Sequence, residues 1–132
     1  MKVAGFFEEF WTRSFGQPAG SVRDFVAEVR YEDADEIGAY LRGGHPVFCA
    51  MGAVEDVLGS GEFFLGGASL FTDGEWLWRG DLRHYVRSHG VTLPEEFLER
   101  VRTRGYEVPA VGRSRLLEVT DHVQGCWSSL PL

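Results

Sequence analysis

The residue types best suited to metal or acid–base chemistry are Asp81, His84 and His89. Imidazole nitrogens and carboxylate oxygens are common zinc ligands, so these residues are a first candidate for a metal site. His84 and His89 are five positions apart, which is about 140° around an α-helix. Because that angle separates the two side chains, we expect no metal ligand set here. A helix cap at Asp81 and a solvent-exposed helix face at His84 explain the residues more simply.

Other candidate motifs do not match the chemistry they suggest. Gly59-Ser60-Gly61 lacks the spacing of a nucleophile elbow, which needs a glycine two positions either side of the serine. It is not a dinucleotide fingerprint either, because position 64 is Phe. Glu95 and Glu96 stand where a helix is expected to start, and there carboxylates favour the helix dipole. We therefore expect no catalytic residue and no cofactor; whether the protein is an enzyme stays open, and a non-enzyme is favoured.

The secondary-structure elements that would position these residues are predicted most clearly around a tight turn at Asp73-Gly74. An Asp-Gly link between two apolar runs predicts a β-hairpin, here over residues 68–79, because both central residues of a type I′ turn need positive φ. A two-residue turn at this corner would place Thr72 opposite Glu75.

Alternation of side chains gives this hairpin two apolar faces. One face carries Phe71, Trp76 and Trp78, and the other carries Leu70 and Leu77. Because neither face is polar, we expect the hairpin to be covered on both sides. The alternative is that the aromatic face is an open binding surface.

Two helices are predicted directly after the hairpin. Asp81 is a suitable N-cap for the first, and Gly90 is suited to end it. Residues 92–95, Thr-Leu-Pro-Glu, match a capping box with proline in the first turn of the second helix, which Gly105 would end.

Patterns in the first part of the chain predict three more helices and a strand. Four aromatic residues at helical spacing indicate a helix over residues 3–14, and Ser21 and Asp33 are suitable caps for a second and a third. The apolar run 47–51 is typical of a buried strand.

Some segments remain ambiguous from sequence. Residues 53–58 fit a strand or a helical turn, 63–65 fit a further strand, and 114–123 fit either element. The tail 125–132 is expected to be loose, with Trp127 as an anchor. Together the patterns predict one α+β domain over residues 1–132, with a mostly antiparallel sheet and about five helices.

Composition limits the classes of partner. The 132 residues suit one domain, and the net charge of −7 makes nucleic acid a poor partner and a basic protein a suitable one. No apolar run has the length of a membrane span, and the N-terminus does not resemble a signal peptide. Cys49 and Cys126 are expected to be a buried thiol and a tail thiol rather than a disulfide, which favours a cytoplasmic location.

A resemblance adds a functional expectation. The segment TDGEWLWRGDLRHYVRSHGVTLPEEF, residues 72–97, resembles a DG-x-W-x-W, D-L-x-x-Y-V, L-P-x-x-F pattern of small, largely uncharacterised actinobacterial proteins. Proteins of this build are similar to the immunity proteins of bacterial toxin systems, which are small, acidic and without an active site. The resemblance covers about a fifth of the chain and brings no active-site residues with it.

Three functions compete on this basis. The first is a non-enzymatic protein-binding module, in its most specific form an immunity-like inhibitor of a basic toxin domain. The second is a small-molecule-binding protein or enzyme with a pocket beside the 68–79 hairpin, and the third is a homodimeric structural protein. The candidate binding residues are Glu75, Trp76, Trp78, Arg79, Asp81, His84 and Tyr85.

Overall fold

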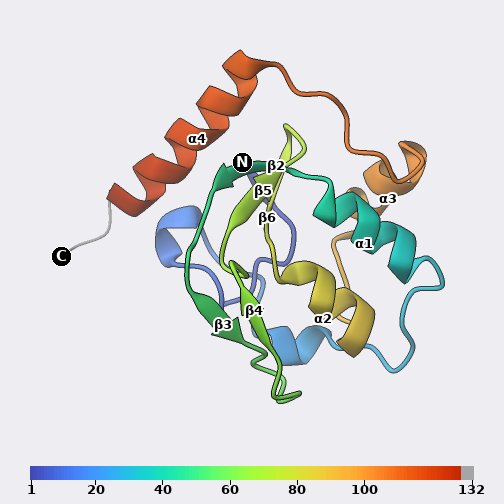
Figure 1. Ribbon diagram of the computed structural model, residues 1–132. Coiled ribbons are helices and arrows are strands. Elements are labelled where there is room, and N and C mark those ends of the chain that lie inside the picture. Colours follow the sequence, from blue (N-terminus) through green and yellow to red (C-terminus); the bar gives the residue numbers. More distant parts are fainter. Residues whose placement is uncertain (129–132) are drawn as a thin grey trace.

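The computed structural model describes residues 1–128 and has the predicted α+β class (Figure 1). Within these residues it has four α-helices, against about five helices predicted: α1 (Ala34–Arg42), α2 (Leu82–His89), α3 (Glu95–Thr103) and α4 (Arg113–Ser128). Two short 3-10 helices, η1 (Arg13–Phe15) and η2 (Val22–Phe25), lie in the N-terminal part.

The strands form two sheets. The larger has the order β1-β6-β5-β2, from β1 (Lys2–Val3), β2 (His45–Phe48), β5 (Leu70–Thr72) and β6 (Trp76–Arg79). Only the β1–β6 pair is parallel, so this sheet is mostly antiparallel, as predicted. The smaller sheet is an antiparallel hairpin of β3 (Ala53–Glu55) and β4 (Phe63–Leu65).

The predicted hairpin forms, but its register differs. Thr72 lies opposite Leu77 rather than Glu75. The reason is that Asp73 Oδ1 accepts hydrogen bonds from the backbone amides two and three residues ahead, at 3.0 and 2.8 Å. This moves the corner one position on, where Gly74 has the positive φ of 99°. Because each residue of β5 pairs with a residue two positions further along β6 than predicted, every side chain keeps its predicted face.

Both faces of the larger sheet are covered, as expected for an apolar hairpin. In Figure 1 the sheet lies between α4 on one side and α1, α2 and α3 on the other. Trp76 and Trp78 belong to the core cluster with these three helices. Leu70 and Leu77 pack on the other face with residues of α4 and the N-terminal segment.

No α-helix forms over residues 3–14, and only the 3-10 helix η1 begins there, at Arg13, so that prediction is wrong. Gly5 has a φ of 72°, and a Cβ there would stand 2.7 Å from the side chain of Leu82. The chain turns at this glycine, and its aromatic residues then separate into different core clusters, with Phe7 in one and Trp11 in another. Their spacing reflects packing in two directions rather than one helical face.

The helices α1, α2 and α3 begin close to the predicted positions, but the predicted side chains do not cap them. The Asp33 carboxylate binds Arg102, and that of Asp81 binds Arg79. Thr92 Oγ1 donates to a backbone carbonyl in η2. Each capping candidate therefore holds two elements together instead. Ser21 does accept from a backbone amide, but the element it caps is only the 3-10 helix η2.

Further differences concern the strand at 47–51 and the C-terminal part. The strand runs instead from 45 to 48 and is half-exposed. Cys49 is exposed and Cys126 is buried, the reverse of the expectation. Residues 114–123 are helical, and α4 continues to Ser128, so the first half of the predicted loose tail is helix. Residues 129–132 and the side chain of Trp127 lie outside the part that the structure describes.

Candidate functional site

The two hairpin tryptophans lie together but belong to the core. Their rings stand 5.2 Å (Trp76) and 5.7 Å (Trp78) from that of Phe97, so both indoles are on one side, as predicted. Trp76 is only 5% exposed and Trp78 is fully buried, with its ring nitrogen donating to the Leu41 carbonyl. Trp78 is out of a partner's reach and Trp76 exposes very little of its ring, so we do not retain them as contact residues.

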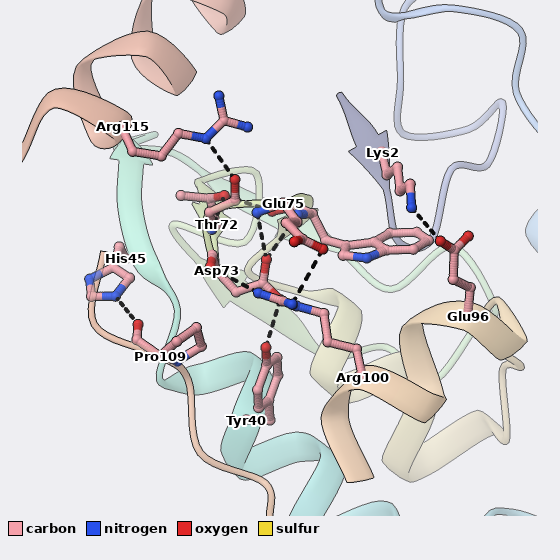
Figure 2. Close-up of polar contacts among 12 residues, drawn as sticks. Lys2, Tyr40, His45, Thr72, Asp73, Glu75, Glu96, Arg100, Pro109 and Arg115 are labelled. Atoms are coloured by element: carbon pink, nitrogen blue, oxygen red, sulfur yellow. Dashed lines mark hydrogen bonds and ion pairs between the residues drawn. The ribbon is translucent and has the colours of Figure 1, made fainter. Parts of the chain in front are cut away.

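A buried carboxylate holds the hairpin corner on which Glu75 lies (Figure 2). Asp73 accepts from the Tyr40 hydroxyl at 2.6 Å and from Arg100 Nε at 2.8 Å. Burial by itself raises the pKa of Asp73, but these hydrogen bonds outweigh it and leave the pKa below its usual value. Glu75 is exposed and pairs with Arg100 at 3.3 Å. The arrangement is structural and offers a partner only the Glu75 carboxylate.

Arg79 and the buried Asp81 form a second ion pair. The guanidinium donates to both carboxylate oxygens, at 3.1 and 2.9 Å, and lies over the Phe10 ring. Burial raises the pKa of Asp81, while Arg79 acts in the opposite direction. Tyr85 is also fully buried, and its hydroxyl oxygen accepts from the Val57 amide at 3.0 Å. All three polar groups are engaged in contacts within the protein.

His84 does not lie on a solvated helix face. Its Nε2 stands 2.9 Å from Asp56 Oδ2, and His89 Nε2 stands 2.6 Å from the same oxygen. Burial alone would raise the pKa of Asp56, but hydrogen bonds from Ser60 and the two histidines leave it well below its usual range. The buried carboxylate therefore joins the β3–β4 loop to the end of α2.

The sequence argument kept His84 and His89 apart, but in the structure both rings turn towards one oxygen of Asp56. The angle of about 140° describes where the side chains leave the helix, whereas each imidazole can turn towards the sector between them. Asp56 lies in that sector, and the two ring centres are 5.2 Å apart. Asp56 was missed because it is 28 residues before His84, and local spacing carries no signal of such a contact.

The outer face of the β3–β4 hairpin is the most exposed apolar surface near the predicted site. Met51, Phe63 and Leu65 are 89%, 65% and 84% exposed. Strand register places Ala53 beside Leu65 and Glu55 beside Phe63 on this face. We call these five residues the outer hairpin face. In Figure 1 the hairpin lies at the end of the molecule away from α4.

This surface was missed as a functional candidate for a simple reason. The apolar triplet 63–65 was predicted to be a strand, and an apolar strand is expected to be buried on both faces. In the structure only Phe64 of the triplet turns inward, with its ring centre 4.4 Å from that of His84. Period-two alternation in so short a strand cannot be recognised when all three residues are apolar.

A hollow of about 440 Å³ lies between β4 and the neighbouring helices, beside the 68–79 hairpin. Phe71 and Asp81 line it, together with Arg42 and Arg83. Since the Asp81 carboxylate is already bound by Arg79, the hollow does not present a free acid or base from the predicted set. This hollow gives no specific support to a small-molecule enzyme.

Comparison of the chain with protein-family models, curated proteins and solved structures found no match. None of the helices within residues 1–128 has the length and apolar composition required to cross a bilayer.

Proposed function

We propose that the protein is a non-enzymatic protein-binding module and that the outer hairpin face is its contact surface. The observation that carries the proposal is the exposure of Met51, Phe63 and Leu65 within one short segment. Single exposed apolar residues are common, but a cluster on one small element is typical of a surface that a partner covers. This surface replaces the buried indoles that the sequence suggested.

The partner we propose is a basic protein domain with apolar groups at its contact surface. Residues 43–78, which include the hairpin, contain five acidic residues and no Lys or Arg, and the whole chain has a net charge of −7. Glu55 lies on the outer hairpin face itself, and Glu62 is exposed beside it. Such a charge distribution attracts a basic domain and repels an acidic one. Arg42 and Arg83 line the hollow beside β4, which Phe63 and Leu65 line as well.

The most specific form of this proposal is an immunity-like inhibitor of a basic toxin domain. It rests on the resemblance of residues 72–97 together with the acidic charge. An inhibitor of this kind needs no catalytic group, only a surface that covers the partner.

Truncation of the outer hairpin face tests the proposal. The double variant Phe63→Ala, Leu65→Ala removes two exposed side chains, so the fold is expected to persist. Full burial of a Leu or Phe side chain contributes about 1.5–3 kcal/mol, so we expect the double variant to bind its partner at least about tenfold more weakly. Val29→Ala is the matched control, because Val29 is 81% exposed and lies outside the hairpin.

The assay is affinity capture from a lysate of the native host, followed by measurement of the dissociation constant for the captured protein. Support requires a basic protein that is retained by wild type and by Val29→Ala, is lost by the double variant, and binds more weakly at high salt. Capture of no such protein would overturn the proposal. Light scattering provides the other decisive outcome: a wild-type dimer that becomes monomeric in the double variant would make this face a homodimer interface instead.

A further inference from the structure

Three potential metal ligands from two separate segments meet at the loop end of the β3–β4 hairpin. Asp56 directly follows β3, whereas His84 and His89 belong to α2. One carboxylate oxygen and one nitrogen of each ring all lie within 4.8 Å of one another. This cluster has no role in the proposed contact surface, and the inference drawn from it does not depend on that proposal.

We propose that Asp56, His84 and His89 bind a divalent transition-metal ion, with Zn²⁺ as the first candidate. Two imidazoles and a carboxylate form a donor set suited to Zn²⁺, Co²⁺ or Ni²⁺ and unsuited to Ca²⁺ or Mg²⁺, which prefer oxygen ligands. Ligand atoms around a tetrahedral ion stand about 3.4 Å apart, from metal–ligand distances of about 2.1 Å. The two nitrogen–oxygen separations of 2.6 and 2.9 Å need to widen by less than about 1 Å to reach it.

Neighbouring groups already hold two of the ligands in suitable orientations. Asp56 Oδ1 accepts from the Leu58 amide at 2.8 Å, which leaves Oδ2 directed at the histidines. His84 Nδ1 stands 3.4 Å from the carboxylate of Glu62. A carboxylate at the far nitrogen of a metal-binding histidine fixes the ring and the tautomer in which Nε2 binds the ion. Glu62 would therefore support the site without being a ligand itself.

Burial and charge agree with a cation at this position. The Asp56 side chain is fully buried, while those of His84 and His89 retain 12% and 21% exposure. An ion could reach the site past the imidazoles. A divalent ion would also compensate the buried carboxylate more fully than the hydrogen bonds from the two imidazoles. Bound there, it would fix the β3–β4 loop to the last turn of α2.

Titration of the chelator-treated full chain with Co²⁺ tests the site. We expect one ion per chain and the visible absorption of tetrahedral Co²⁺, displaced by Zn²⁺. The variants Asp56→Asn and His89→Gln each remove one ligand and are expected to abolish this absorption. Zn²⁺ at about a hundredfold excess over its dissociation constant should raise the melting temperature of wild type by about 10 °C.

His122→Gln is the matched control for adventitious binding. His122 Nε2 lies 3.6 Å from Cys126 Sγ, so this pair is the competing place for a soft ion. The control variant should retain the Co²⁺ absorption at full strength. Loss of absorption in His122→Gln, with retention in Asp56→Asn, would overturn the proposed site.

A second measurement uses only wild-type protein and so does not depend on whether the variants fold. The chain has four histidines, whose ring nitrogens can be observed by NMR. Addition of Zn²⁺ should shift the Nε2 signals of His84 and His89, while those of His45 and His122 stay in place. Unchanged signals of His84 and His89 at millimolar Zn²⁺ would refute the proposal.

Discussion

Replacement of Asp73 by Asn tests how much one buried carboxylate stabilises the fold. Asp73 is 1% exposed and accepts hydrogen bonds from Tyr40, Arg100 and two backbone amides. Asparagine has nearly the same volume, and its remaining oxygen can still accept from the two amides. Its NH₂ group, however, would face the Tyr40 hydroxyl and Arg100 Nε, which both donate to Asp73 in the wild type.

The expected loss of unfolding free energy follows from these two contacts. Each charge-assisted hydrogen bond contributes about 1.5–3 kcal/mol. The Arg100 side chain retains 18% exposure, so water compensates part of its loss. We therefore take the lower value twice and expect Asp73→Asn to destabilise the protein by about 3 kcal/mol. For a chain of this size that is a fall in melting temperature of about 12 °C.

Urea denaturation at neutral pH measures the loss, with Glu75→Gln as the control. Glu75 also pairs with Arg100, but its side chain is 60% exposed, so its replacement should cost less than about 0.5 kcal/mol. Tyr40→Phe alone removes the hydrogen bond from the Tyr40 hydroxyl to Asp73. The loss of unfolding free energy in the double variant Asp73→Asn, Tyr40→Phe should therefore be about 1 kcal/mol smaller than the sum of the two single losses. A loss below about 1 kcal/mol for Asp73→Asn, or an equal loss for Glu75→Gln, would refute the reasoning.

Two further changes test the packing and the electrostatics of the fold. The hydrogen bond from Arg102 is the largest cause that lowers the pKa of Asp33, from 3.8 to about 2, so this carboxylate stabilises the folded state above about pH 4 and ceases to do so as the pH falls towards 2. Because the pair is partly solvated, it contributes about 1 kcal/mol to the free energy of unfolding. Urea denaturation between pH 4 and 2 should show that this free energy depends less on pH in Asp33→Asn than in wild type. Equal slopes in the two proteins would contradict this. Gly44→Ala places a Cβ 2.5 Å from the Trp78 ring, whereas Gly52→Ala meets nothing within 4 Å. We expect the first to cost about 1–3 kcal/mol and the second less than about 0.5 kcal/mol by the same denaturation assay, and similar losses in both would disprove the close contact.

The parts of the fold that could be predicted are those fixed by short-range chemistry. Gly90 ends α2 with a φ of 66°, as expected of a C-terminal glycine. The faces of the hairpin were correct although the pairing was not, because a shift of two residues preserves the alternation of side chains. The register itself depended on hydrogen bonds from the Asp73 side chain to two backbone amides, which no pattern of apolar residues encodes.

The N-terminal segment shows why the aromatic pattern misled. Phe7 and Trp11 are spaced like neighbours on one helix face, yet they pack in separate clusters. Gly5 at positive φ and the pairing of β1 with β6 set the direction of the chain there. Pairing with a strand more than seventy residues later in the sequence outweighs local propensity in this segment.

The candidate site depends on the segment that sequence patterns left most ambiguous. An isolated two-stranded hairpin is at best marginally stable in water, so β3–β4 must be held by its inner side. That side places Phe64 against His84 and the Asp56 carboxylate against both histidines. The opposite side carries the exposed Phe63 and Leu65.

The two proposals therefore meet in one element. A metal ion at Asp56, His84 and His89 would reduce the freedom of the hairpin whose outer face we assign to the partner. The first ligand to bind already restricts the conformational freedom of the hairpin, so the second ligand loses less entropy on binding. Each ligand should therefore strengthen the binding of the other. Because such coupling is reciprocal, a partner that binds Phe63 and Leu65 should itself raise the affinity for Zn²⁺, and equal Zn²⁺ affinities with and without the partner would show that the hairpin is already rigid.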